Sequence, residues 1–261
     1  MHKLYSNVIL TFVLFAYFIP FSLLAKSAIH FTEYHILLTE DEPNRTYPIF
    51  NQGDSAAFCE ARFIDYIISA DGSKRLATKD QLSPTSAQSM LRVSPRRVTI
   101  PPLSSQKLKV AARGLRKQRD SEWVSYLSLS CKDKSPDVTA IGITILPTYT
   151  FNIPTIVRKG SLNANLTISK AKVVQGSKNS KAIELVLSHS GERSVYGNIL
   201  IKDADGNEIG ALVNVSVYQE ESRKTLNIVL KKAIEGNKIT MSFTEHEKYG
   251  GSQLANYELS I

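Results

Sequence analysis

The residues of this chain that could do chemistry are five histidines, two cysteines and a few closely spaced acids. The histidines show no spacing that is typical of metal ligands. Asp120 with Glu122, and Glu245 with Glu247, are two residues apart, which on a strand only places them on one face. The sequence contains no nucleophile elbow, zinc-binding helix or phosphate-binding loop. We therefore expect a protein that is not an enzyme, with no catalytic residues, metal, cofactor or small-molecule substrate.

The two cysteines, Cys59 and Cys131, point to a structural role instead. Each lies in a strand-like segment, FCEARFIDY and WVSYLSLSC, and an even cysteine count in an exported chain is typical of disulfides. We predict one bond between two strands of the first domain, contributing roughly 4 kcal/mol through the long loop that it closes. Two buried free thiols are the alternative, which export disfavours.

Export is indicated by the N-terminus. Lys3 precedes a mostly apolar run over residues 8–25, interrupted by Pro20, and small residues precede a cleavage point after Ser27. This layout is typical of a secretory signal peptide, here residues 1–27. A retained membrane anchor is the alternative, since the run is nearly long enough to span a bilayer.

Removing that segment leaves 234 of the 261 residues, a length that suits two domains. The formal net charge falls from +8 to +6, because Lys3 and Lys26 leave with the signal. The basic residues are scattered among 24 acids and form no run interleaved with aromatic residues. This distribution does not indicate a nucleic-acid partner.

The elements that must position any site are predicted to be strands throughout. In the first half, short alternating segments predict strands over 29–39, 45–51, 57–69, 92–100, 106–112, 121–131 and 139–157. Seven strands in about 125 residues are typical of an immunoglobulin-like sandwich.

A second β-rich region follows the segment Lys159-Gly160-Ser161, which we interpret as a hinge. Its predicted strands are 162–174, 182–189, 197–202, 208–218, 224–231, 238–244 and 254–261. Asp205-Gly206 predicts a tight hairpin between the third and fourth of them. We therefore expect an all-β chain with an immunoglobulin-like domain over 28–158 and a β-sandwich domain over 159–261.

The strand that leads to the hinge has unusual features. Ile141, Ile143 and Ile145 alternate with small or polar residues, and the strand is long enough to overhang its own domain. Pro147 and Pro154 lack an N–H, which favours an edge or bent strand over a central one. An apolar edge strand can pair with another chain, and a core strand that bends at each proline is the alternative.

Three segments, taken together and in order, resemble a known family. They are LRVSPRRVTIPP with the following SSQKLKVAARGL, then RDSEWVSYLSLSC, and then FNIPTIVRKG. These are similar to an Arg-rich strand with its proline turn, the acidic head of strand F, and the end of strand G in the periplasmic chaperones of the chaperone-usher pilus assembly pathway. The later stretches SGERSVYGNILIKDADGNEIG and VNVSVYQEESRKTLNIVL resemble the second domain of relatives outside the best-studied type.

The resemblance implies two immunoglobulin-like domains in a boomerang arrangement, located in the periplasm. It further implies that the protein binds pilus or fimbrial subunits by donating an edge strand, and that it delivers them to an outer-membrane usher. The residues that would enter the subunit groove, or seat the strand that does so, are Ile141, Ile143, Ile145, Tyr149, Phe151 and Ile153.

The resemblance also assigns an interdomain salt bridge. Arg158 matches the family's arginine, Glu122 its first acid, and Glu247 lies one residue from the position of its second acid. A surface arginine paired only with solvent is the alternative.

The family's two cations for the subunit carboxylate correspond to His35 and Pro154, which departs from the pattern. Two alternatives remain: the carboxylate is bound by Arg62, Lys159 or another cation, or the subunit is seated differently. As an alternative function, we keep a secreted two-domain β-sandwich adhesin or surface-binding protein.

Overall fold

The structure is a computed structural model that describes residues 26–69, 73–134, 147–176 and 180–261. Most of the expected signal peptide and the three isoleucines Ile141, Ile143 and Ile145 lie outside the described residues. The described chain is all-β, as expected, apart from three short 3-10 helices. These are η1 (Lys79–Gln81), η2 (Leu115–Lys117) and η4 (Glu247–Tyr249). Within the described ranges, no helix has the length and apolar character needed to cross a bilayer.

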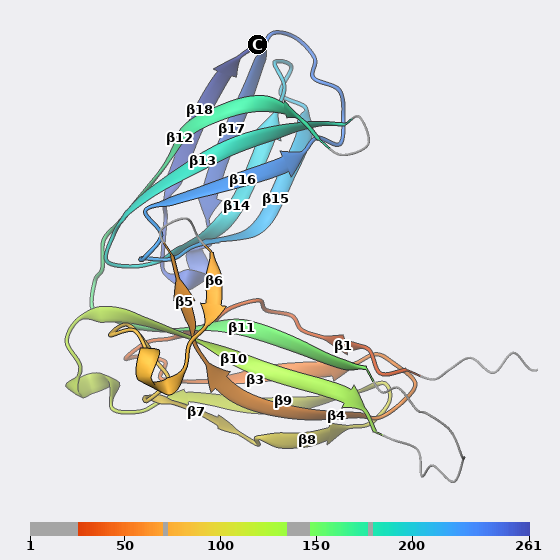
Figure 1. Ribbon diagram of the computed structural model, residues 1–261, viewed down its shortest axis with the longest axis vertical. Helices are drawn as coiled ribbons and strands as arrows, with labels where there is room; N and C mark the ends of the chain where they lie inside the picture. Colours follow the sequence, from red (N-terminus) through yellow and green to blue (C-terminus); the bar gives the residue numbers. More distant parts are fainter. Residues whose placement is uncertain (1–25, 70–72, 135–146, 177–179) are drawn as a thin grey trace, which may run out of the picture.

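The first sandwich packs two sheets face to face (Figure 1). The four-stranded sheet has the order β1 (Ile29–His30), β3 (Asn44–Asn51), β9 (Ser104–Ala112), β7 (Leu91–Ser94). The five-stranded sheet has the order β2 (Ile36–Leu38), β11 (Thr148–Lys159), β10 (Ser121–Asp133), β4 (Ala57–Ile64), β8 (Arg97–Ile100). A separate hairpin, β5 (Tyr66–Ile68) and β6 (Lys74–Leu76), extends toward the second sandwich.

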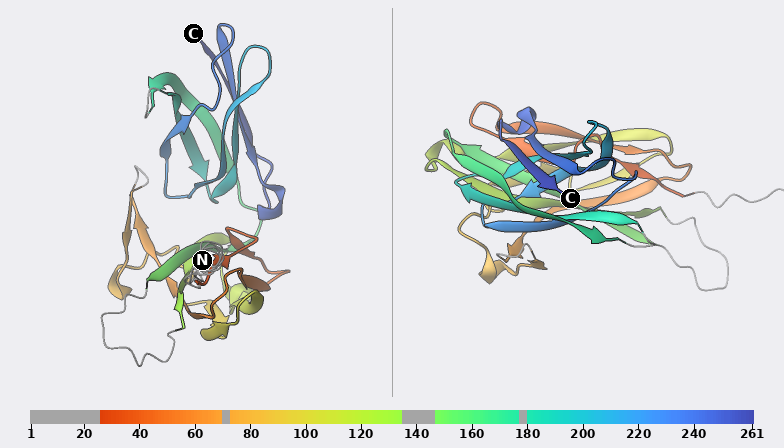
Figure 2. Two further views of the ribbon diagram at one scale, coloured as in Figure 1. Left: turned by 90° about the vertical axis from the view of Figure 1, so that its right-hand side faces the viewer. Right: turned by 90° about the horizontal axis from the view of Figure 1, so that it is seen from above.

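The second sandwich also has two sheets. One has the order β12 (Ala164–Gln175), β13 (Lys181–Gly191), β16 (Arg223–Val229). The other has the order β15 (Glu208–Val217), β14 (Val195–Lys202), β17 (Lys238–Glu245), β18 (Leu254–Ser260). The long strands of the two sandwiches run in different directions in Figures 1 and 2, so the molecule is bent like a boomerang.

Period-two alternation explains most of these strands. Along β9, Leu108 and Val110 are buried while Lys107 and Lys109 are exposed, because successive side chains point to opposite faces. Each sandwich has its own hydrophobic core, and Leu127 and Phe243 are among the fully buried residues of the two. A third, smaller cluster lies between the sandwiches.

The structure divides three segments that the sequence predicts as single strands. Residues 29–39 form β1 and β2, which belong to different sheets of the first sandwich. Residues 92–100 form β7 and β8, again in different sheets, and Pro95 between them cannot donate a ladder hydrogen bond. Residues 57–69 divide into β4 and β5. In each case the chain leaves one sheet for another within what alternation alone presents as one strand.

The predicted hairpin at Asp205-Gly206 agrees with the structure, and the connection between the sandwiches contains a second glycine with a positive φ. Gly206 has φ +84° in the connection between β14 and β15, which pair as a hairpin. Gly160, in the connection between the sandwiches, has φ +78°, and a Cβ there would lie 2.4 Å from Cγ of Asp120. Both the positive φ and the close approach require glycine at position 160.

Candidate functional site

Strand β11 is paired very differently along its two edges. Its sequence TYTFNIPTIVRK pairs with β10 over its whole length, from Thr148 opposite Lys132 to Lys159 opposite Ser121. On its other edge, β2 pairs in parallel only with residues 155–157. We call 148–154 the open segment of β11, because no strand among the described residues pairs with its outer edge. We call 155–159 the seated segment.

Burial increases along the strand from the open to the seated segment. The Tyr149 side chain is half exposed, at 50%. The Phe151 ring is half-buried and contacts the Phe31 ring at a centroid distance of 4.8 Å. Ile153 is buried at 5% exposure, and Ile156 is fully buried. The open segment thus begins at the surface and is anchored progressively in the core of the first sandwich.

Pro154 ends the open segment. It lies opposite Tyr126 of β10 and has no N–H to donate. The structure therefore agrees with the expectation that β11 is an edge strand at this position. In an antiparallel ladder alternate residues point their N–H and C=O groups away from the partner strand. In the part of the chain that the structure describes, no strand pairs with these outward-pointing groups of the open segment, so an added strand could pair with them.

The seated segment ends in a buried ion pair. Nε and Nη2 of Arg158 donate to Oε2 of Glu122 at 2.9 and 2.7 Å. Glu122 is fully buried and Arg158 is 7% exposed. The two residues are direct neighbours in the β10–β11 register, which explains the two-bond geometry. The structure thus brings together the two residues that sequence motifs assign to the first half of the interdomain bridge.

Both members of this pair also reach the second sandwich, through its backbone. Oε1 of Glu122 accepts a hydrogen bond from the Ser194 N–H at 2.8 Å. Nη1 of Arg158 donates to the carbonyl oxygen of Tyr249 at 2.5 Å. One fully buried carboxylate and one buried guanidinium therefore join the two sandwiches.

The expected third member, Glu247, does not occupy this position. Its side chain is exposed on η4, and among the described residues it forms no ion pair with Arg158. The short helix instead directs the Tyr249 carbonyl toward the guanidinium. Glu245, two residues earlier, is buried and accepts hydrogen bonds from both terminal nitrogens of Arg193. A backbone oxygen thus takes the role that the sequence assigns to an acid.

Four tyrosines make the junction between the sandwiches aromatic, and sequence reasoning missed them. Tyr126, Tyr196, Tyr218 and Tyr249 are buried together with Leu37 and Ile156. Neighbouring rings lie with centroids 5.6 to 6.2 Å apart. Nζ of Lys74, on the β6 side of the hairpin, lies 4.3 Å from the centroid of the Tyr218 ring. The junction is therefore packed, with a cation–π contact at its rim.

His35, at one of the positions that matches a cation of the family, lies inside this junction. Its Nε2 is 2.9 Å from Oγ of Ser216, and its ring contacts those of Tyr196 and Tyr249. Burial, with a smaller contribution from the charge of His246, lowers the pKa of His35 to about 4. A neutral buried imidazole packed between the sandwiches cannot serve as a cationic anchor near neutral pH.

The alternative cations differ in availability. Nζ of Lys159 is engaged by the carbonyls of Arg116 and Gln118 and lies 3.4 Å from a Glu40 carboxylate oxygen. Arg62 is exposed on β4, opposite Ser128 of β10. Of these two alternatives, Arg62 is the more accessible.

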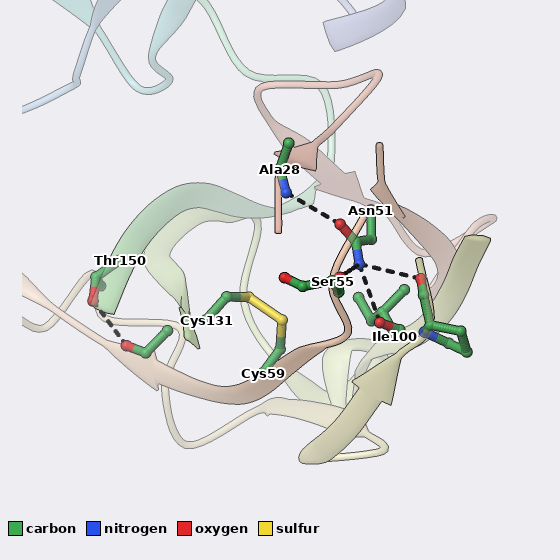
Figure 3. The surroundings of a disulfide bond; sticks show 9 residues. Ala28, Asn51, Ser55, Cys59, Ile100, Cys131 and Thr150 are labelled. Carbon is green, nitrogen blue, oxygen red and sulfur yellow. Dashed lines mark hydrogen bonds between the residues drawn. A yellow bond between two sulfur atoms is a disulfide. The ribbon is translucent and has the colours of Figure 1, made fainter. Parts of the chain in front are cut away.

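The predicted disulfide is confirmed and stabilises the same sheet (Figure 3). Cys59 of β4 and Cys131 of β10 are direct cross-strand neighbours with Cα atoms 4.1 Å apart. The Ser130 and Thr150 hydroxyls, 2.9 Å apart, link β10 to the open segment beside it. The disulfide thus links β4 to β10, the strand that pairs with the open segment.

Comparisons with known proteins give similarity in structure rather than in sequence. No family model and no curated protein sequence matches the chain. The YadV chaperone has 13% identity and a TM-score of 0.47, over 90% of this chain and 100% of that one. The E. coli chaperone DraB has 13% identity and a TM-score of 0.47, over 90% and 97%.

A third similar structure is a complex. The CsuC–CsuE chaperone–tip adhesion subunit pre-assembly complex, from archaic chaperone-usher Csu pili of Acinetobacter baumannii, has 12% identity and a TM-score of 0.49. The similarity covers 89% of this chain and 98% of that chain.

Proposed function

We propose that this protein is a periplasmic chaperone that binds pilus or fimbrial subunits by lending them an edge β-strand and delivers them to an outer-membrane usher. The observation that carries the proposal is the open segment of β11, which has a paired inner edge and an outer edge without a strand among the described residues. An added strand would gain ladder hydrogen bonds there. The proposal is for a binding protein and not an enzyme.

The division of labour along the donor strand follows from its sequence and burial. Ile141, Ile143 and Ile145 supply a row of apolar side chains in the sequence, and Tyr149 continues it at the exposed end of β11. Phe151 and Ile153, also in the open segment, pack against the core of the first sandwich and hold the strand in its own domain. Burial of three isoleucines in a partner contributes roughly 5 to 9 kcal/mol before association costs. Release by exchange for another strand then needs no nucleotide.

The rest of the chain supports this strand. The pair of Arg158 and Glu122, with the Tyr249 carbonyl, holds the angle between the sandwiches. The proposed division is a signal peptide over 1–27, a chaperone domain over 28–158 and a second β-sandwich domain over 159–261.

Co-expression tests the proposal. A small pilus subunit that lacks its last strand is expressed in the periplasm in three ways: with the wild-type protein, with the Ile143→Asp variant, and alone. We expect the wild type to raise soluble subunit, and Ile143→Asp to abolish this while remaining folded. Val213→Asp is the matched control, because Val213 is 62% exposed on β15 of the second sandwich. Subunits that are equally soluble without the protein, or normal binding by Ile143→Asp, would contradict strand donation.

A further inference from the structure

A small pocket lies where the β5–β6 hairpin meets the junction of the two sandwiches. Its volume is about 250 Å³, and it is lined by Asp65 with β5, by residues between 81 and 86, and by the first half of β10. Glu220 of the second sandwich contributes to its wall and accepts a hydrogen bond from the Thr85 hydroxyl at 2.7 Å. Much of the remaining wall is apolar or aromatic, with Ile68, Val124 and Tyr126. This volume lies just below the range of about 300–1,000 Å³ that is usual for small-molecule sites.

Asp65 in this pocket has an unused acceptor. The residue is 5% exposed and lines the pocket. Its Oδ2 accepts the Ser86 hydroxyl at 2.6 Å, whereas Oδ1 has no hydrogen-bond partner in the described part of the chain. No described lysine or arginine forms an ion pair with it. A buried carboxylate oxygen without a donor is costly, so the site is suited to a ligand that brings one.

The free oxygen and the walls select the kind of donor. One free carboxylate oxygen suits an ammonium, which bonds as a point charge, better than a guanidinium, which prefers two parallel bonds. A hard metal ion needs six or more oxygen ligands, and the described residues hold no group of three His, Cys, Asp or Glu residues that could bind one. Apolar walls suit a chain of methylene groups, and Glu220 adds negative charge. The matching chemistry is a primary ammonium at the end of an alkyl chain.

We propose that this pocket takes up a lysine side chain of the polypeptide that docks on β11. Its methylene groups would pack on Ile68, Val124 and the aromatic walls. Its ammonium would donate to Oδ1 of Asp65 after a rotation of that side chain into the pocket, because this atom exposes less than 1 Å² in the unbound structure. The source of the lysine rests on the proposed function. The pocket adjoins the open segment, because Nδ2 of Asn152 donates to the hydroxyl of the pocket residue Tyr66 at 2.8 Å.

A matched pair of small probes tests the pocket without any subunit. Acetyl-lysine methylamide and acetyl-norleucine methylamide share the alkyl chain and differ in the ammonium. Titrated into the mature protein, the lysine probe is expected to shift the backbone amide signals of Asp65, Ser86 and Val124 saturably. The norleucine probe is expected to bind at least tenfold more weakly. Equal binding of the two probes, or no saturable shift with the lysine probe, would overturn the proposal.

Variants locate the binding. Asp65→Asn keeps an acceptor for Ser86 and removes the charge, and is expected to weaken the lysine probe at least tenfold. Glu60→Gln is the control, since Glu60 is an exposed acid on the adjoining β4 that does not line this pocket. If Asp65→Asn fails to fold, Ile68→Trp fills the pocket and leaves Asp65 unchanged, with the same expected loss. Undiminished binding by whichever of these two variants folds contradicts the proposal.

The outcomes separate this proposal from the proposed function. Co-expression with Ile143→Asp reports on strand donation and does not involve the pocket. If subunits bind but the lysine probe does not, the pocket proposal alone fails. If the probe binds and strand donation fails, the pocket binds lysine but the docking polypeptide is not a pilus subunit held by β11.

Discussion

The open and seated segments of β11 are parts of one strand with opposite environments. The seated segment lies between β10 and β2, is buried, and ends in the pair of Arg158 and Glu122. Among the described strands only β10 pairs with the open segment, whose Tyr149 is half exposed. Stability and availability for pairing are therefore located in different residues of the same strand. A substitution can therefore change the stability of the protein with little effect on the availability of the strand for pairing, or the reverse.

The first strand of the sandwich produces this difference. β2 covers residues 155–157 of β11, but the chain before it crosses to the other sheet, where β1 pairs with β3. A continuous first strand would have covered the open segment as well. The break between β1 and β2 thus leaves the edge accessible.

The largest expected effect on stability is at Arg158. Arg158→Ala leaves the fully buried Glu122 without its cation and should lower the free energy of unfolding by about 3–5 kcal/mol. Urea unfolding measures it. Arg97→Ala is the control, because Arg97 pairs with Glu60 at the surface, and its expected loss is within about 1 kcal/mol. Equal losses for the two variants would show that the ion pair does not secure the seated segment.

His35 is expected to make the junction sensitive to acid. Its pKa is lowered from 6.5 to about 4 in the folded protein, so the unfolded chain binds a proton more readily between these values. Stability from this group is complete above pH 6.5 and is lost as the pH falls toward 4, by up to roughly 3 kcal/mol. Unfolding measured across this range should show a shallower loss for His35→Gln. Identical pH profiles would exclude His35 as the cause.

Phe151 lies between the two environments and should give an intermediate effect. Its ring is half-buried against Phe31, so Phe151→Ala is expected to cost about 1–2 kcal/mol, less than a fully buried phenylalanine. Thermal or urea unfolding provides the measurement. A loss as large as that of Arg158→Ala would mean that the open segment is a part of the core like the seated one.

The smallest effect on stability is expected at Tyr149. Tyr149→Ala should change the free energy of unfolding by no more than about 0.5 kcal/mol, because half of the side chain is already exposed. The same variant should retain less subunit in the periplasmic co-expression assay. If stability falls by more than 1 kcal/mol, or if subunit retention is unchanged, Tyr149 does not belong to the proposed binding surface.

Much of the fold could be predicted from the sequence, because apolar and polar residues alternate along a strand with the same period of two as buried and exposed side chains. Cys59 and Cys131 could be paired because export and strand-like surroundings leave few alternatives for two cysteines. The breaks within 29–39 and 92–100 could not be predicted, since a strand that changes sheets keeps its alternation. The acceptor at Tyr249 could not be predicted either, because a backbone carbonyl belongs to every residue.

The second sandwich shows the same limit. The buried pair of Arg193 and Glu245 joins residues far apart in sequence, and no local pattern marks either one. The junction tyrosines, such as Tyr196 and Tyr218, alternate like any core residue. Alternation shows that a side chain faces inward but does not show whether it faces its own core or the neighbouring sandwich.

The parallel pairing of β2 with β11 has a consequence for the order of folding. Ile36 is made early, yet its partner Thr155 follows more than a hundred residues later. In the proposed exported protein, the five-stranded sheet cannot be completed until the seated segment has crossed the membrane as well. Closing so long a loop is entropically costly and slow compared with forming local hairpins. The contacts of Glu122 with Ser194 and of Arg158 with Tyr249 join residues that are still later in the chain. Docking of the two domains should therefore be the last step of folding.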